Sequence, residues 1–316
     1  MLLRQRLAVL LLILAASHSA DAHGIAGNRF FPGTMTFDDP AVADELLVTP
    51  SSLKHPLDDT SGFGVVDDRV GWAFARLLTA DVSVGIDSGW IHRSGLGFPT
   101  QSGFDQTSLT IKRLMYKDDL HETLVSASLS WGIGGSGAQG VGANSPDIIR
   151  PGLFIGKGLG DLPESLSWLR PFGIAAAVTL DVPMRHTVVN FGFNPDNNQF
   201  GPSVGPAVET LHWGFAIEYS TLYLTSRFKP GQLPKNEPLH QLVPLVEFAF
   251  DSPRGQKTIA TMNPGLAYVE DVWQLSAEVI VPLNGETGRS LGARAQLLLF
   301  LDDLVPSVFG KLLLGR

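Results

Sequence analysis

The chain has 316 residues, with 23 Lys and Arg, 31 Asp and Glu, 34 Gly, 21 Pro and no Cys. The absence of Cys excludes a disulfide framework, a zinc–thiolate site and a thiol nucleophile. The acidic balance argues against a surface that follows nucleic-acid phosphates, so we expect no nucleic-acid partner.

Residues 1–22 have the features of a secretory signal peptide. Arg4 and Arg6 form a basic start, residues 7–16 form an unbroken apolar run, and residues 20–22 fit a small-residue cleavage site. The run is too short to cross about 30 Å of hydrocarbon as a helix, so we predict cleavage and export, with an uncleaved anchor as the alternative. The remaining chain would carry 21 basic and 30 acidic side chains.

Residues 23–66 are rich in Pro, Asp and short polar runs, such as Phe37-Asp38-Asp39-Pro40, and lack sustained periodicity. We predict an irregular N-terminal extension here, either periplasmic or plug-like, with one short helix at residues 41–47. The remaining residues, 67–316, form the second predicted unit.

From residue 67 onward, apolar residues alternate with polar or small residues. In residues 211–219 one phase contains Trp213 and Ile217, and the other contains His212 and Glu218. A period of two places one phase on each face of a strand. Eleven segments share this pattern: residues 70–78, 81–93, 106–116, 122–133, 148–157, 169–182, 211–219, 240–250, 259–269, 272–281 and 291–301. Residues 221–229 are ambiguous between a strand and a short helix.

Three features favour a membrane barrel over a soluble periplasmic β protein, which is the alternative. The less apolar phase is mostly Ser, Gly, Ala and Thr with isolated charges, which suits a lumen. The predicted export of a chain without disulfides and without a second anchor is compatible with an outer-membrane destination. Aromatic residues fall near strand ends, as in interfacial girdles: Trp72, Trp90, Trp131, Trp168, Trp213, Tyr268 and Trp273. We therefore predict an all-β fold, a closed antiparallel transmembrane β-barrel of about 10–12 strands.

The carboxyl end departs from this expectation. Outer-membrane barrels usually end in an aromatic residue that the barrel-insertion machinery reads. This sequence ends in residues 312–316, Leu-Leu-Leu-Gly-Arg, and Phe309 is the nearest aromatic residue. The insertion signal is therefore predicted to be absent or displaced.

Several short motifs resemble an uncharacterised family of exported proteobacterial proteins, which is similar to the phenol-degradation meta-pathway barrels described as outer-membrane transporters. The resemblance covers most of residues 23–316 and implies an outer-membrane β-barrel. It implies no catalytic or binding residue. The motifs are His23-Gly-Ile-Ala-Gly-Asn-Arg-Phe-Phe-Pro-Gly, Phe37-Asp-Asp-Pro, Gly156-Lys-Gly-Leu-Gly-Asp-Leu-Pro, Leu169-Arg-Pro-Phe, Asn263-Pro-Gly and Phe300-Leu-Asp-Asp-Leu.

Motifs for nucleotide binding and catalysis are weak. Residues 132–137 satisfy G-x-G-x-x-G, but the Gly- and Pro-containing run that follows cannot start the required helix. Ser126, Ser128 and Ser130 share a strand face, yet no spacing brings them to a His and a carboxylate. The His residues show no paired metal-ligand spacing. We predict no catalytic residue, no metal site and no cofactor.

The candidate lumen-lining residues are charges in the small, polar phase of predicted strands. They are Glu218, Glu247, Glu278 and Arg294, each flanked by apolar neighbours. A charge facing lipid at the midplane costs about 2–4 kcal/mol for Arg or Lys and less for Glu, so these side chains should point inward. Either they contact a solute or they form an ion-pair network that fills a narrow barrel. Lys112 and Arg113 are adjacent and must point to opposite faces.

These observations predict an outer-membrane barrel that passively admits a small solute, with apolar and aromatic compounds among the candidates. Its expected partners are outer-membrane lipid, the barrel-insertion machinery and the unidentified solute. Two alternatives stay open: a structural or interaction barrel with a sealed lumen, and a barrel enzyme that acts on lipids.

Overall fold

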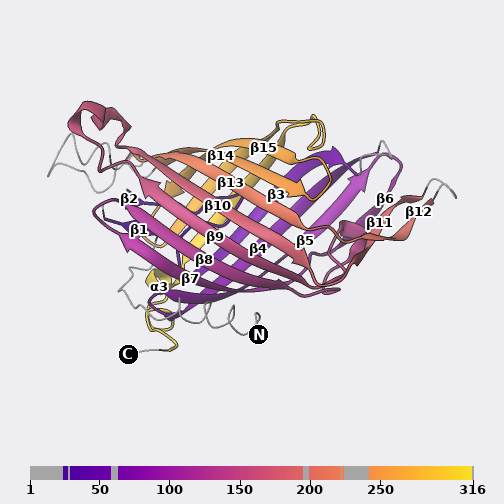
Figure 1. Cartoon of the computed structure of the whole chain (residues 1–316), viewed down its shortest axis with the longest axis horizontal. Coiled ribbons are helices and arrows are strands. Elements are labelled where there is room, and N and C mark those ends of the chain that lie inside the picture. The colour runs from indigo at the N-terminus through magenta and orange to yellow at the C-terminus, as the bar shows by residue number, and fades with distance from the viewer. Residues whose placement is uncertain are drawn as a thin grey trace, which may run out of the picture.

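The computed structural model describes residues 24–27, 29–57, 63–194, 199–221, 223 and 242–314. Twelve antiparallel strands form a closed barrel, because β4 and β5 pair directly and complete the ring (Figure 1). The predicted closed all-β barrel is confirmed, at the upper end of the expected range. The barrel strands are β3 (Glu45–Pro56), β4 (Gly64–Thr79), β5 (Val82–Gly95), β7 (Ser108–Asp118), β8 (Thr123–Gly132), β9 (Ile148–Gly158), β10 (Phe172–Pro183), β13 (Thr210–Tyr219), β14 (Leu242–Pro253), β15 (Ile259–Val269), β16 (Trp273–Pro282) and β17 (Gly292–Phe300).

Smaller elements lie at the two ends of the barrel. The strand β6 (Phe98–Phe104) pairs only with β5, and β11 (Thr187–Asn194) and β12 (Gln199–Pro206) form a separate hairpin at the same end. The remaining elements are β1 (Ile25–Ala26), β2 (Arg29–Phe30), η2 (Gln139–Val141), η3 (Glu164–Leu169) and α3 (Leu301–Leu304). Among the described residues, no helix is long and apolar enough to cross a membrane.

Each of the eleven predicted strand segments corresponds to a barrel strand, and the twelfth strand lies where the irregular extension was expected. Residues 45–56 form β3, which pairs with β17 on one side and β4 on the other. The predicted helix at residues 41–47 and the boundary at residue 66 are therefore wrong. Pro50 and Pro56 interrupt the alternation of β3, and its strand form depends on pairing across the closing seam. The predicted signal peptide and most of residues 221–229 lie outside the described residues.

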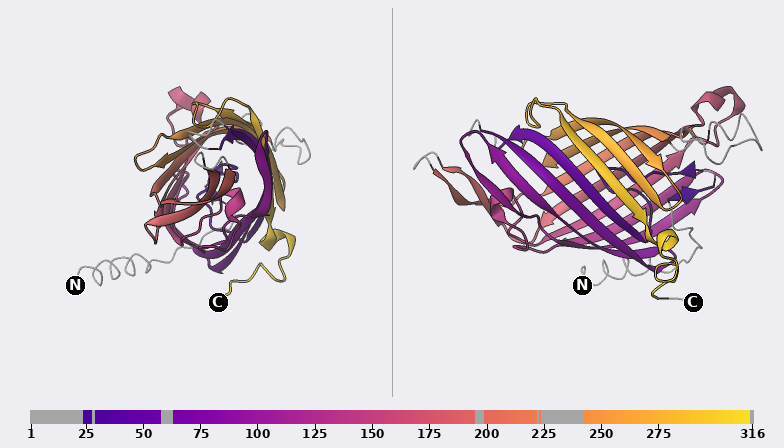
Figure 2. Two further views of the ribbon diagram at one scale, coloured as in Figure 1. Left: turned by 90° about the vertical axis from the view of Figure 1, so that its right-hand side faces the viewer. Right: turned by 180° about the vertical axis from the view of Figure 1, so that it is seen from behind.

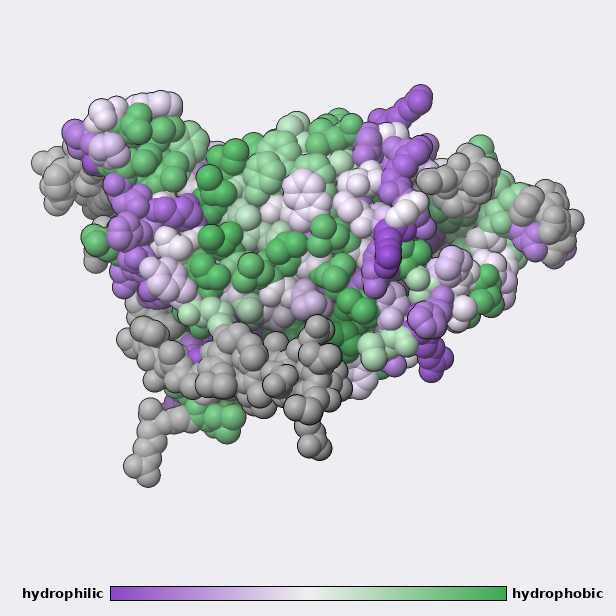
Figure 3. Space-filling model, in the orientation of Figure 1, coloured by the Kyte–Doolittle hydropathy of each residue, from purple (hydrophilic) through white to green (hydrophobic). Residues whose placement is uncertain are grey.

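The outer face of the barrel is apolar. Leu109, Ile111, Leu129 and Ile155 are each more than 40% exposed on it. Figure 3 shows this hydrophobic surface across the middle of the molecule, with hydrophilic residues gathered towards both ends. Trp131 lies next to the end of β8, as expected of an interfacial aromatic residue. This distribution matches the apolar belt of a transmembrane barrel.

The last barrel strand ends at Phe300, and the chain continues along the outside of the barrel. The Arg76 guanidinium on β4 donates to the carbonyl oxygens of Val308, Phe309 and Lys311 at 2.6–3.0 Å. The Phe309 ring packs edge-on against Phe74, with centroids 6.2 Å apart. An aromatic residue thus does end the final strand, and Phe309 belongs to a docked tail rather than to the barrel wall.

Candidate functional site

The N-terminal residues 24–27 and 29–44, here called the lumenal segment, lie inside the barrel. Figure 2 shows this indigo segment within the ring of strands, near the end of the barrel that carries α3. Gly33 and the Gln274 side chain exchange two hydrogen bonds of 3.1 and 2.8 Å, and Gln296 donates to the Thr34 carbonyl at 2.8 Å. The Gln side chains come from β16 and β17, so the wall itself satisfies the backbone of the segment.

Three of the four sequence-predicted charges hold the lumenal segment. Glu247 on β14 accepts the backbone N–H groups of Met35 and Thr36, each at 2.8 Å. Arg294 on β17 donates to Glu278 on β16 at 2.6 Å and to the Thr36 hydroxyl at 2.7 Å. The carboxylates and the guanidinium therefore face the lumen, where they contact this chain's own N-terminal residues.

Glu218, the fourth predicted charge, is buried on the inner face of β13 with 2% of its surface exposed. Within the described part of the chain, neither of its carboxylate oxygens has a hydrogen-bond partner. Arg29 of the lumenal segment is the cation that influences it, but the guanidinium pairs with Glu122 and donates to the carbonyl oxygens of Arg170 and Pro171. The structure does not bring Glu218 together with the Glu278–Arg294 pair.

Lys112 and Arg113 point to opposite faces of β7, as their adjacency requires. The Lys112 ammonium enters the lumen and donates to the Asp38 carboxylate at 2.8 Å and to the Asp39 carbonyl at 2.5 Å. Arg113 lies on the outer side and pairs with Asp81, 3.2 Å away. The lumenal segment is thus held from β7 as well as from β14, β16 and β17.

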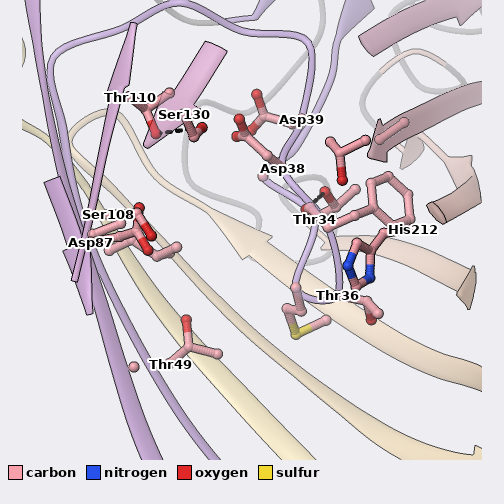
Figure 4. Close-up of a pocket in the computed structure, with 18 of the residues that line it drawn as sticks. Thr34, Thr36, Asp38, Asp39, Thr49, Asp87, Ser108, Thr110, Ser130 and His212 are labelled. Atoms are coloured by element: carbon pink, nitrogen blue, oxygen red, sulfur yellow. Dashed lines mark hydrogen bonds between the residues drawn. The ribbon is translucent and has the colours of Figure 1, made fainter. Parts of the chain in front are cut away.

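Beyond the lumenal segment, the lumen opens into a cavity of about 840 Å³. Thr34, Thr36, Asp38 and Asp39 of the segment form one wall of this cavity. The opposite wall carries hydroxyl side chains from neighbouring strands and a carboxylate (Figure 4). These wall residues are Thr49, Asp87, Ser108, Thr110 and Ser130.

A row of alternating charges crosses four adjacent strands at one side of the cavity. Arg150 on β9 forms a bidentate pair with Asp181 on β10. His212 on β13 lies between two carboxylates, with Nε2 3.3 Å from Asp181 and Nδ1 2.5 Å from Asp251 on β14. Sequence reasoning did not single out this row, although each member falls in the small, polar phase of its strand, the criterion that identified Glu218.

Two of the serines considered from the sequence, Ser126 and Ser130, have partners other than a histidine. Ser126 donates to the Pro40 carbonyl and Ser130 bonds to Thr110, so neither contacts His212. In the part of the chain that the structure describes, no group of three or more His, Asp or Glu side chains is placed to hold a metal ion.

No protein-family model and no curated protein matches the chain. Solved structures match it in fold. The COG4313 outer membrane channel from Pseudomonas putida F1 is 11% identical, with 86% of this chain and 99% of that chain covered and a TM-score of 0.50. The β domain of the Bordetella autotransporter BrkA is 9% identical, with 82% and 99% covered and a TM-score of 0.49. The chain therefore has the fold of outer-membrane β-barrels, which is the fold that its sequence motifs imply.

Proposed function

We propose that this protein is an outer-membrane channel that passively admits small hydrophilic solutes. The observation that carries the proposal is a cavity of about 840 Å³, lined by charged and hydroxyl side chains together with apolar ones, inside a closed barrel whose outer face is apolar. A barrel with this distribution is stable in a bilayer and encloses water and polar groups. Outer-membrane lipid and the barrel-insertion machinery are its proposed partners, and no cofactor is required.

The cavity lining favours a polar solute over the apolar or aromatic solute considered from the sequence. Apolar side chains such as Phe37 and Phe250 also line the cavity, but its hydroxyls and charged groups bind water, which an apolar solute would have to displace without replacing its hydrogen bonds. The lumenal segment narrows the path at the other end of the barrel, so we expect a small conductance.

Single-channel recording of the purified full chain in planar bilayers tests this function. Discrete conductance steps from a protein whose gel mobility changes on boiling would support it. A folded, membrane-inserted barrel that passes no current would contradict it and favour a sealed structural barrel. That second candidate is supported by the hydrogen bonds that hold the lumenal segment to β14, β16 and β17.

A further inference from the structure

The cavity contains a carboxylate that no cation neutralises at short range. Asp87 projects inward from β5, between Gly85 and Gly89 on the same face, and is half-buried. Among the described residues it has no hydrogen-bond or ion-pair partner, whereas the two arginines that influence it most are already engaged. Arg69 pairs with Asp105 at 2.8 Å, and Arg150 pairs with Asp181.

Carboxylates outnumber Lys and Arg side chains over the lining of the cavity as a whole. Its lining includes seven carboxylates and four Lys or Arg side chains. Each of these four cations has a carboxylate partner, as Lys112 has Asp38 and Arg294 has Glu278. An entering anion would therefore meet no unpaired Lys or Arg, whereas an entering cation would find Asp87 available.

Hydroxyl groups surround this carboxylate. Ser108 lies directly opposite Asp87 in the β5–β7 register. Thr110 and Ser130 continue the wall on β7 and β8, with their oxygens 2.8 Å apart. Figure 4 shows Asp87 beside Ser108, facing the cavity. The wall thus combines one negative charge with donors and acceptors suited to a hydroxylated molecule.

We propose that this wall is a binding and selectivity site for small hydroxylated amines, with Asp87 as the partner of the ammonium group and Ser108, Thr110 and Ser130 as partners of the hydroxyls. The proposal rests on the channel function and names its solute class. It follows from charge and hydrogen-bond complementarity, because the ammonium group of the solute supplies the cationic partner that Asp87 does not find in the wall.

The test is bilayer recording of the full chain under a KCl gradient, followed by addition of glucosamine, glucose or gluconate. We expect a reversal potential that indicates cation preference, and partial block of the current by glucosamine but not by glucose or gluconate. Asp87→Asn should weaken the block by roughly two- to fivefold, the range for loss of a half-exposed ion pair. Arg69→Gln should increase cation preference because it releases Asp105.

The matched control is Asp271→Asn, which removes a carboxylate from the exposed turn between β15 and β16 and should change nothing. Heat-modifiable gel mobility verifies that each variant folds. A conducting channel without cation preference, or one whose glucosamine block survives Asp87→Asn, would overturn the solute assignment and leave the channel function intact. The absence of any conductance would overturn both.

Discussion

Glu247 on β14 accepts the backbone N–H of Thr36 at 2.8 Å, although the two residues are 211 positions apart in the sequence. The second oxygen of the same carboxylate accepts the N–H of Met35. One buried side chain therefore anchors two consecutive peptide groups of the lumenal segment to the barrel wall.

Glu247→Ala should loosen the lumenal segment. The substitution leaves two buried N–H groups without an acceptor, at a cost of about 1–3 kcal/mol for each unsatisfied group. We expect a larger single-channel conductance and faster proteolysis within residues 29–44. Glu247→Gln keeps one acceptor oxygen and should have a smaller effect. Equal conductance in all three proteins would show that the contact does not restrict the path.

Deletion of residues 29–40, with the predicted signal sequence retained, should widen the lumen at the end of the barrel that carries α3. Conductance should rise further than in Glu247→Ala, because the whole obstruction is removed rather than loosened. Gel mobility before and after boiling reports whether the barrel still closes. An intact barrel with wild-type conductance would place the restriction elsewhere.

Arg294→Met should destabilise the barrel. The Glu278 side chain is fully buried, and breaking a buried ion pair from one side costs about 3–5 kcal/mol. We expect the folded form of the barrel, identified by its gel mobility without boiling, to be lost at a lower temperature than in the wild type. Adding Glu278→Gln to Arg294→Met should recover part of the loss, because the unpaired charge is then absent. An unchanged transition in Arg294→Met would show that the pair contributes little.

Arg76→Gln should release the C-terminal tail from the outer face of the barrel. The variant loses a guanidinium that donates to three carbonyl oxygens of residues 308–311 and that also pairs with the buried Asp44 carboxylate. Trypsin should then cleave after Lys311 faster than in the wild type, and the thermal stability of the barrel should fall because the buried Asp44 carboxylate is left unpaired. Phe30→Leu, at the other end of the chain, provides a control that does not touch the tail. A cleavage rate equal to that of the wild type would contradict this account.

Much of the fold could be predicted from the sequence because strand alternation is local. In eleven barrel strands the alternation within the strand itself predicts which face meets lipid. Residues such as Trp213 and Ile217 are exposed on the outer face, as this pattern requires. The strand β3 was not predicted, because Pro50 and Pro56 interrupt its alternation of apolar and polar residues. Its identity as a strand depends on pairing with β17, which is distant in the sequence, and with β4, which follows after a connection.

The candidate site was only partly predictable. The cost of placing a charge in lipid directs Glu218, Glu247, Glu278 and Arg294 inward, and this could be argued from each strand alone. Which cations and anions pair could not, because pairing depends on the register between neighbouring strands. Asp87 illustrates the difference: its inward phase is readable from the sequence, but its lack of a partner appears only once Arg69 and Arg150 are seen to be engaged.

The sequence by itself predicted an export signal. It also determined the alternation of each strand and the face of the barrel wall on which each residue falls, since these depend on nearest neighbours along one strand. Only the tertiary structure decided that the ring closes with twelve strands, that residues 24–27 and 29–44 occupy the lumen, and that a cavity is left beyond them. These features arise from contacts between segments far apart in the sequence, such as Thr34 and Gln296, which are 262 positions apart, and local periodicity does not encode such contacts.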